Sequence, residues 1–91
     1  MPVYLGIDYG TKRMGLAWAD ELGIALPLTT IPGVDSESCW DKLRHIVEAR
    51  RVSHFVVGYP LHMDGSVGKR ANEVDRFVSR LVDEFDLPAS K

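Results

Sequence analysis

The chain has 91 residues, which is enough for one domain, residues 1–91, with a thin hydrophobic core. A hydrophobic share of 45% and a charged share of 26% are typical of a soluble globular protein, while the net charge of -2 excludes an overall basic surface for nucleic acid. The sequence has no apolar stretch near the roughly 20 residues of a membrane span. Its first ten residues lack the basic and apolar pattern of a signal peptide, and it has one cysteine, so we expect a cytoplasmic protein with neither a disulfide nor a membrane partner.

The first part of the chain predicts three strands joined by short turns. Residues 3–8 alternate between apolar residues and small or polar residues, which is the pattern of a half-buried strand. Residues 14–19 predict the returning strand, and residues 24–31 a third strand in which Pro27 lies near an edge or a bulge. Three consecutive strands with tight connections predict an antiparallel meander.

The hydrophobic period then changes from strand to helix. Asp35 or Ser36 is expected to cap a helix that ends near Arg51, because apolar residues recur between them at helical spacing. Residues 54–58 predict a short strand rich in β-preferring side chains. Residues 69–85 carry apolar side chains every three or four positions and predict a second helix.

The resulting order, β-β-β-α-β-α, predicts an α/β fold with a mixed sheet. Three strands run antiparallel, and the helix that follows allows the fourth strand to run parallel to the first through a right-handed crossover. If these two strands are neighbours, their carboxyl ends share one edge of the sheet. Asp8 and the loop of residues 59–68 would then meet where open α/β sheets bind ligands.

Asp8 is the first candidate for chemistry, since it ends a strand directly before a glycine turn. Its carboxylate either caps the turn or faces a cleft in which it can hold Mg²⁺ or Mn²⁺. Gly10, with its backbone freedom, and Thr11 would let backbone donors approach a phosphate. Lys12 and Arg13 add positive charge there, although a solvated basic turn is an alternative interpretation.

The loop of residues 59–68, which contains Asp64, leads into the second predicted helix. Lys69 and Arg70 open this helix. The free N–H groups and positive dipole end of a helix N-terminus suit an anion, most simply a nucleic-acid phosphate. A solvated helix start is the alternative.

Two segments of the sequence resemble one protein family. The stretch LGIDYGTKRMGLA (residues 5–17) looks like the opening motif of the YqgF family, and VGYPLHMDGSVG (residues 57–68) is similar to that family's loop after the fourth strand. His62 stands where the family usually has asparagine. The family is related to Holliday-junction resolvases and is regarded as acting at the 5′ end of pre-16S rRNA.

The resemblance implies an RNase H-like fold and a hydrolase that cleaves RNA phosphodiesters with Mg²⁺ or Mn²⁺, in ribosome biogenesis. Asp8 would be the catalytic residue and the metal ligand. The substrate would be pre-rRNA or branched nucleic acid. The residues expected to bind it are Gly10, Thr11, Lys12, Arg13, Asp64, Lys69 and Arg70.

The resemblance also covers only the N-terminal part of the family. Family members continue into a strand with a D-E-R-L-T-T-like motif and then to another aspartate, whereas this chain ends at Lys91. We therefore expect the fifth strand to be missing and the 91-residue chain to be weakly active or inactive. Residues 54–58 would then form an open edge, which predicts homodimerisation, strand exchange or a covering segment.

Two rival functions remain open. A non-catalytic RNA-binding module of the same fold would use the basic residues of both motifs; we interpret Trp18 and Trp40 as core residues and not as platforms for stacked bases. An ATP-binding domain of the actin, Hsp70 and sugar-kinase type is the second rival, because residues 8–11 resemble the first phosphate loop of those proteins.

Overall fold

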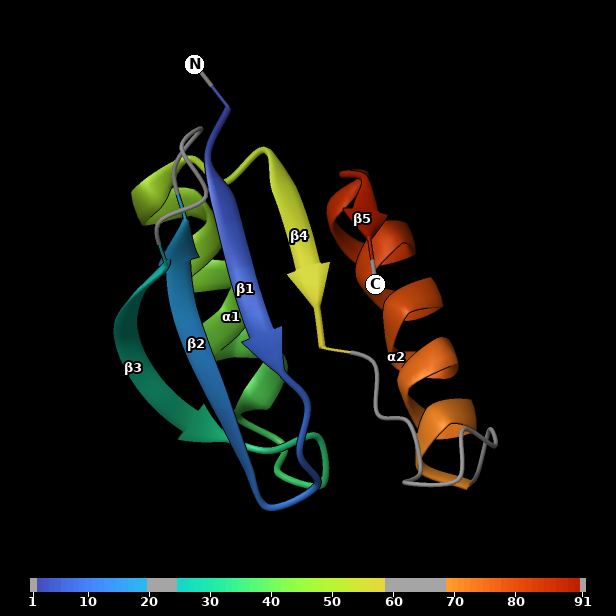
Figure 1. The fold of residues 1–91 in the computed structure, drawn as a ribbon. Helices are drawn as coiled ribbons and strands as arrows, with labels where there is room; N and C mark the ends of the chain where they lie inside the picture. The colour runs from blue at the N-terminus through green and yellow to red at the C-terminus, as the bar shows by residue number, and fades with distance from the viewer. Residues whose placement is uncertain (1, 20–24, 59–68, 91) are drawn as a thin grey trace.

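The computed structural model describes residues 2–19, 25–58 and 69–90, which form one mixed sheet and two helices (Figure 1). The elements in chain order are β1 (Tyr4–Asp8), β2 (Arg13–Ala19), β3 (Ala25–Pro32), α1 (Cys39–Arg50), β4 (His54–Val57), α2 (Lys69–Phe85) and β5 (Ala89–Ser90). The strands lie side by side in the order β3-β2-β1-β4-β5. The α/β class and the order of the first six elements are as predicted.

β1 lies at the centre of the sheet and joins its antiparallel half to its parallel half. It pairs antiparallel with β2, ending with Asp8 opposite Gly15, and β2 pairs antiparallel with β3. On its other side β1 pairs parallel with β4, where Leu5 lies opposite Phe55. The parallel pairing is possible because α1 carries the chain back across the sheet between β3 and β4. The predicted meander followed by a parallel fourth strand is therefore confirmed.

β3 is the edge strand on the antiparallel side, and its irregularity falls where the proline predicted it. The register passes from Leu16 opposite Thr29 to Ala17 opposite Pro27, so Leu28 is the extra residue of a bulge. A proline lacks the N–H that a central strand needs, and edges and bulges tolerate this loss. The prediction for Pro27 is confirmed.

The start of α1 differs from the prediction. The helix begins at Cys39 with Ser38 at its N-cap, so capping by Asp35 or Ser36 is wrong. Ser36 belongs to a separate turn, because its amide N–H donates to the carbonyl oxygen of Gly33 at 2.9 Å. Its hydroxyl accepts from the amide N–H of Ser38 at 3.3 Å. The segment before α1 thus has a hydrogen-bonded structure of its own.

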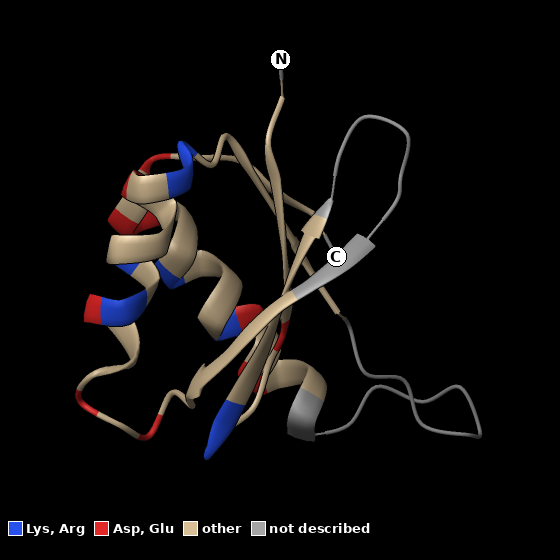
Figure 2. Ribbon diagram, turned by 90° about the vertical axis from the view of Figure 1, so that its left-hand side faces the viewer, with Lys and Arg blue, Asp and Glu red and all other residues tan. Residues whose placement is uncertain are grey.

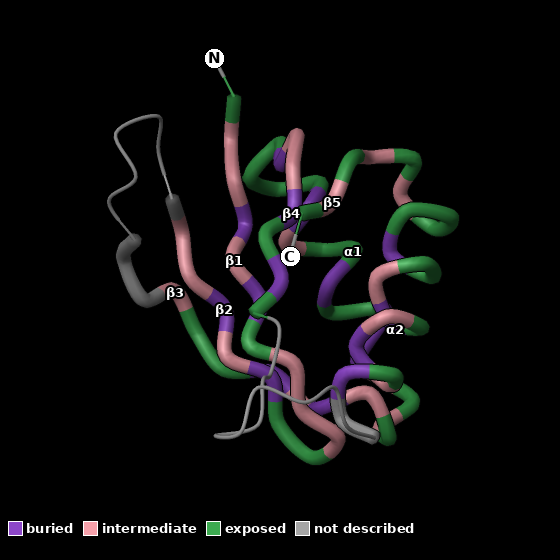
Figure 3. The backbone as a smooth tube through the Cα atoms, turned by 45° about the vertical axis from the view of Figure 1, so that its right-hand side comes forward, coloured by how far each residue is buried: buried purple, intermediate pink, exposed green. Residues whose placement is uncertain are grey.

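Both helices pack on one face of the sheet and bury a single core against it (Figures 2 and 3). Alternate residues of the strands point into this core, while the residues between them point to the opposite face. That face has no helix over it among the described residues, and Val56 is 43% exposed there. The buried hydrophobic residues are Leu5, Ile7, Met14, Leu16, Ile31, Cys39, Trp40, Leu43, Val47, Val52, Phe55, Val57, Ala71, Val74, Phe77 and Leu81.

The sequence predicts that the fifth strand is missing, and this prediction is wrong. Ala89–Ser90 form β5, which pairs parallel with β4, and the amide N–H of Phe55 donates to the carbonyl oxygen of Pro88 at 2.9 Å. A two-residue strand has no alternating pattern from which a sequence could reveal it. β5 is a covering segment of the kind expected for this edge, and homodimerisation through residues 54–58 stays a prediction. Neither α1 nor α2, as described, has the length and apolar character of a bilayer-spanning helix.

Candidate nucleic-acid site at the sheet edge

Asp8 ends β1 at the edge of the sheet where β1 and β4 both finish. Its side chain is exposed, whereas Ile7 before it is buried. With the other described residues its carboxylate forms neither a hydrogen bond nor an ion pair. The amide N–H of Gly58 donates to the carbonyl oxygen of Ile7 at 2.9 Å, so the chain that leaves β4 starts beside Asp8. The predicted juxtaposition holds up to Gly58, and the loop of residues 59–68 lies outside the described residues.

Small residues flank Asp8 on both neighbouring strands. Gly15 lies opposite it on β2, and a Cβ atom at Gly15 would come 3.6 Å from the Cβ atom of Asp8. Gly58 follows β4 on the other side and is exposed. Together they leave an open groove of about 620 Å³ on the helix-free face, with a floor formed mainly by apolar and glycine residues. The carboxylate therefore opens into a space that a substrate can reach.

The turn after Asp8 is held by the segment that precedes α1. The carbonyl oxygens of residues 10–12 accept hydrogen bonds from the amide N–H groups of residues 33–35, at N···O distances of 2.8–3.0 Å. A Cβ atom at Gly10 would collide with the carbonyl oxygen of Arg13, and one at Gly33 would collide with the carbonyl group of Thr11. Glycine is required at position 10 for lack of space, and not for the backbone freedom that the sequence suggested.

This turn carries four of the residues predicted to bind substrate. Lys12 and Arg13 are exposed, and Gly10 and Thr11 are half-buried. Neither cation forms an ion pair with another described residue. The turn lies at one end of the sheet, where Figure 2 shows its basic residues in blue. The structure thus brings Gly10–Arg13 together with Asp8, and their contact with a substrate stays a prediction.

The other predicted residues are only partly placed. Lys69 and Arg70 are the first two residues of α2, whose N-terminal end lies at the same edge of the sheet as the end of β1 (Figure 1). Their side chains lie outside the described part of the structure, as does Asp64. Whether these three residues approach Asp8 therefore stays a prediction.

The described residues do not fit a divalent cation site. In residues 2–19, 25–58 and 69–90, no group of three or more His, Cys, Asp and Glu side chains gathers closely enough to hold a metal ion. Mg²⁺ demands a near-octahedral shell of oxygen ligands, and Asp8 supplies a single carboxylate. Among the described residues Asp8 alone does not complete such a shell, and the predicted Mg²⁺ or Mn²⁺ site stays a prediction.

A second hollow, on the helix side of the same edge, was missed by the sequence reasoning. We call it the helix-side pocket, and its volume is about 450 Å³. Tyr9, which follows Asp8 in the chain, lines this pocket together with other aromatic residues and two arginines. Its lining residues are Tyr9, Val34, Trp40, Glu73, Arg76, Phe77 and Arg80. The sequence predicts Trp40 as a core residue, and Arg76 and Arg80 were not considered as site residues, so no sequence signal linked these residues.

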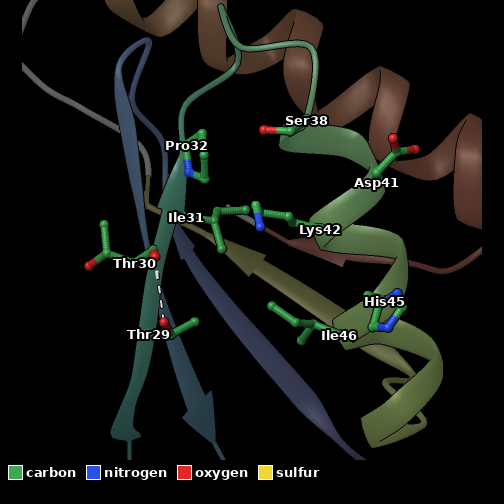
Figure 4. Close-up of a pocket in the computed structure, with 9 residues that line it drawn as sticks. All are labelled: Thr29, Thr30, Ile31, Pro32, Ser38, Asp41, Lys42, His45 and Ile46. Atoms are coloured by element: carbon green, nitrogen blue, oxygen red, sulfur yellow. Dashed lines mark hydrogen bonds between the residues drawn. The ribbon is translucent and has the colours of Figure 1, made fainter.

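A further groove lies between the edge strand β3 and α1, and it contains none of the predicted site residues. It measures about 610 Å³, and Figure 4 shows Lys42 reaching from α1 toward Ile31 while the Ser38 hydroxyl points into the space. The Thr29 hydroxyl donates to the carbonyl oxygen of Thr30 at 3.4 Å. Its carboxylate, Asp41, is paired with Arg44 at 3.3 Å, and no glycine lines the groove, so we place the candidate site at the carboxyl edge.

Comparison with known proteins gives relatives along nearly the whole chain. A protein from Opitutus terrae is 46% identical over 81 residues, which are 89% of this chain and 56% of the relative. A protein from Geobacillus kaustophilus is 43% identical over 88 residues, covering 92% of this chain and 63% of the relative. Both carry the name "Putative pre-16S rRNA nuclease". The chain thus spans less than two thirds of the length of these curated relatives.

The family and the fold agree with the two motifs. YeaZ from Pseudomonas aeruginosa superposes with a TM-score of 0.54 at 18% identity, over 99% of this chain and 42% of that one, a likeness that concerns the fold alone. The profile of the RuvX family, described as Holliday junction resolvase, matches residues 2–91. This match and the mixed sheet confirm the predicted RNase H-like class and the resemblance to resolvase-like proteins. The chain therefore belongs to the RuvX family of Holliday junction resolvases.

Proposed function

We propose that this chain is the substrate-binding and Asp8-bearing part of a nuclease that acts on RNA phosphodiesters. The observation that carries the proposal is the position of Asp8, an exposed carboxylate at the end of β1 with Gly15 opposite it on β2 and Gly58 directly after β4. The exposed Lys12 and Arg13 follow it within the same turn. A carboxylate next to cations suits phosphodiester hydrolysis, because the cations bind phosphate while the carboxylate orients or deprotonates the attacking water.

The substrate is proposed to be the 5′ end of pre-16S rRNA, and the role to be ribosome biogenesis in the cytoplasm. Pre-16S rRNA comes from the names of the relatives, of whose length this chain covers 56% and 63%, whereas the 5′ end, the role and the compartment are expectations from the sequence. Branched nucleic acid is the alternative substrate, in keeping with the description of the family. Dependence on Mg²⁺ or Mn²⁺ is part of the proposal, but we assign no step to the cation because Asp8 is the single carboxylate at the described site.

Slow cleavage is expected from this chain by itself. Among residues 2–19, 25–58 and 69–90, Asp8 is the one carboxylate that lines the groove, and groups that position a nucleophile or a cation act together in catalysis. This observation also favours the second candidate function, a non-catalytic RNA-binding module that uses the same edge of the sheet. The nuclease cleaves RNA and depends on Asp8 to do so. The binding module binds RNA without cleaving it, and its affinity does not depend on Asp8.

Cleavage and binding of a labelled single-stranded RNA with the 5′ sequence of a pre-16S rRNA would separate the two candidates. The nuclease proposal expects slow cleavage with Mg²⁺ or Mn²⁺ that is lost in Asp8→Asn and in EDTA. Asp83→Asn is the matched control, since it removes an exposed carboxylate from α2 that has no ion-pair partner among the described residues. RNA binding without cleavage, unchanged in Asp8→Asn, would support the binding module and contradict the nuclease.

A further inference from the structure

The helix-side pocket opens directly beside the candidate site. Tyr9 lines it, and Tyr9 follows Asp8 in the chain, so their Cα atoms are about 3.8 Å apart. Asp8 lines the groove on the helix-free face, while Tyr9 lines the pocket on the helix side. A polymer that crosses this edge of the sheet would therefore touch both hollows within neighbouring residues.

Three aromatic rings of the pocket pack against one another in tilted pairs. The Tyr9 and Phe77 ring centroids lie 5.2 Å apart, and those of Phe77 and Trp40 lie 5.4 Å apart. Phe77 and Trp40 are buried, whereas Tyr9 is half-buried, so Tyr9 is the ring that a ligand can reach and the other two support it from behind. A supported aromatic face is the usual surface on which an unpaired base stacks.

Two arginines of α2 also line the pocket. Arg76 and Arg80 lie four residues apart on α2 and therefore on the same side of the helix. Arg76 forms no ion pair with any residue in the described part of the chain. Arg80 lies 4.1 Å from the centroid of the Trp40 ring and 3.8 Å from a Glu84 carboxylate oxygen, and its side chain is 54% exposed. The guanidinium groups of Arg76 and Arg80 repel each other at this spacing. An anion placed between them would be attracted by both.

The indole N–H of Trp40 is a second indication that this pocket binds a ligand. The residue is only 8% exposed, and its indole Nε1–H is buried without an acceptor. A buried donor without a partner destabilises a fold by about 1–3 kcal/mol, and native structures rarely leave one unexplained. It is the sole orphaned buried side-chain group recorded for the described residues, and it lies in a residue of this pocket. An oxygen atom of a ligand in the pocket would supply this acceptor, as a bound water would.

We propose that the helix-side pocket is a nucleotide subsite, which holds the base and phosphate of a residue of the RNA strand adjacent to the one at Asp8. Of the ligand chemistries that combine an aromatic face with a dianionic or monoanionic group, a nucleotide matches the Tyr9 ring and the Arg76 and Arg80 guanidinium groups together. Glu73 also lines the pocket, so a ligand of pure negative charge, such as inorganic phosphate, fits it less well. The subsite rests on the proposed RNA substrate and assigns a path for the strand across the edge of the sheet.

The first test is binding of a fluorescently labelled single-stranded RNA dodecamer by the full 91-residue chain in EDTA, so that cleavage plays no part. Arg76→Gln and Arg80→Gln are each expected to weaken binding about fivefold and to lower the slope of log K against log salt by about 0.7 per lost phosphate contact. Arg50→Gln is the matched control. It removes the same charge from the far end of α1, where Arg50 stacks on Trp18, and is expected to change affinity less than twofold.

A second readout reports on the pocket directly. Trp18→Phe leaves Trp40 as the one tryptophan of the chain, so its emission responds to an occupant of the pocket. RNA should change this emission, and Arg76→Gln should remove most of the change at the same RNA concentration. Tyr9→Leu should weaken RNA binding about tenfold and Tyr9→Phe should preserve it, because the ring and not the hydroxyl stacks on a base.

Several outcomes would overturn the subsite. Wild-type affinity and salt slope in both Arg76→Gln and Arg80→Gln would do so, as would no RNA binding by the unmodified chain. Adenosine monophosphate alone serves as a further probe, and Arg76-dependent binding of it without binding of RNA would show a mononucleotide site in place of a strand subsite. The proposed nuclease fails separately, if Asp8→Asn leaves cleavage unchanged while the Arg76 and Arg80 variants still weaken binding.

Discussion

The two faces of the sheet are built from the same strands but differ in how deeply their residues are buried. On the helix-covered face Leu5, Phe55 and Val57 are completely buried, whereas on the opposite face Val56 is 43% exposed and Gly6 leaves room beside Ala17. Neighbouring positions in a strand point to opposite faces, so the division follows from parity alone. The strand residues that face the helices stabilise the fold. The residues between them line the groove into which Asp8 opens. Substitutions of adjacent residues should therefore have very different effects.

The largest difference in the free energy of unfolding is expected between substitutions of Phe55 and of its neighbour Val56. Phe55→Ala removes a fully buried ring from the centre of the core and should lower the free energy of unfolding by about 3–5 kcal/mol. Val56→Ala removes an exposed side chain and should change it by less than about 0.5 kcal/mol. Urea unfolding followed by far-ultraviolet circular dichroism measures both.

Because the Phe55 variant can fall below the stability that the domain needs, Ile7→Val supplies a milder form of the same comparison. It should cost about 0.5–1.5 kcal/mol on the covered face. Equal costs for Phe55→Ala and Val56→Ala would mean that both faces are buried in solution, and would contradict the one-sided core.

A medium effect is expected at the turn beside the site. Gly33→Ala places a Cβ atom against the backbone of Thr11 and Gly10, which cannot move aside cheaply, so the free energy of unfolding should fall by about 1–3 kcal/mol. Gly6→Ala is the matched control on the open face, since its Cβ atom would meet Ala17 at an ordinary 3.6 Å. We expect this variant to be neutral or slightly more stable, because alanine loses less backbone entropy than glycine. A neutral Gly33→Ala would mean that the turn gives way easily.

The smallest effect concerns Cys39 under the helix-covered face. Burial raises the pKa of its thiol, and the positive charge of Arg80 opposes this shift. Since the pKa is higher in the folded state, the contribution to stability is fully present below the unfolded pKa and is lost as pH rises through the folded value. Stability should therefore fall more steeply above about pH 9 in the natural chain than in Cys39→Ala.

Reaction of the thiol with a disulfide reagent provides the independent measurement. At pH 8 the folded chain should react slowly and the urea-unfolded chain quickly, because the buried group is both protonated and inaccessible. Arg80→Gln should slow the folded reaction further, since it removes the charge that lowers the pKa. Rapid labelling of the folded chain at pH 8 would show that α1 opens readily at its N-terminus.

The fold was predictable where the hydrophobic period was long, and the site only where it lay in one continuous motif. The bounds of α2 agree with the prediction, because its apolar positions repeat over four turns. The start of α1 was wrong because a hydrogen-bonded turn at Gly33–Ser36 offers the same capping residue types as a helix. The helix-side pocket could not be predicted, since it joins Tyr9 to two arginines of α2 that are distant in sequence.

The backbone hydrogen bonds between residues 33–35 and residues 10–12 have a mechanical consequence. Their three amide protons can exchange with deuterium only when the turn after Asp8 separates from the segment that leads into α1. A ligand that displaces this turn must therefore pull on the start of α1, the helix that carries Trp40. A displacement of the turn after Asp8 is in this way transmitted to the start of α1. Hydrogen–deuterium exchange of these three amides would measure it at single-residue resolution.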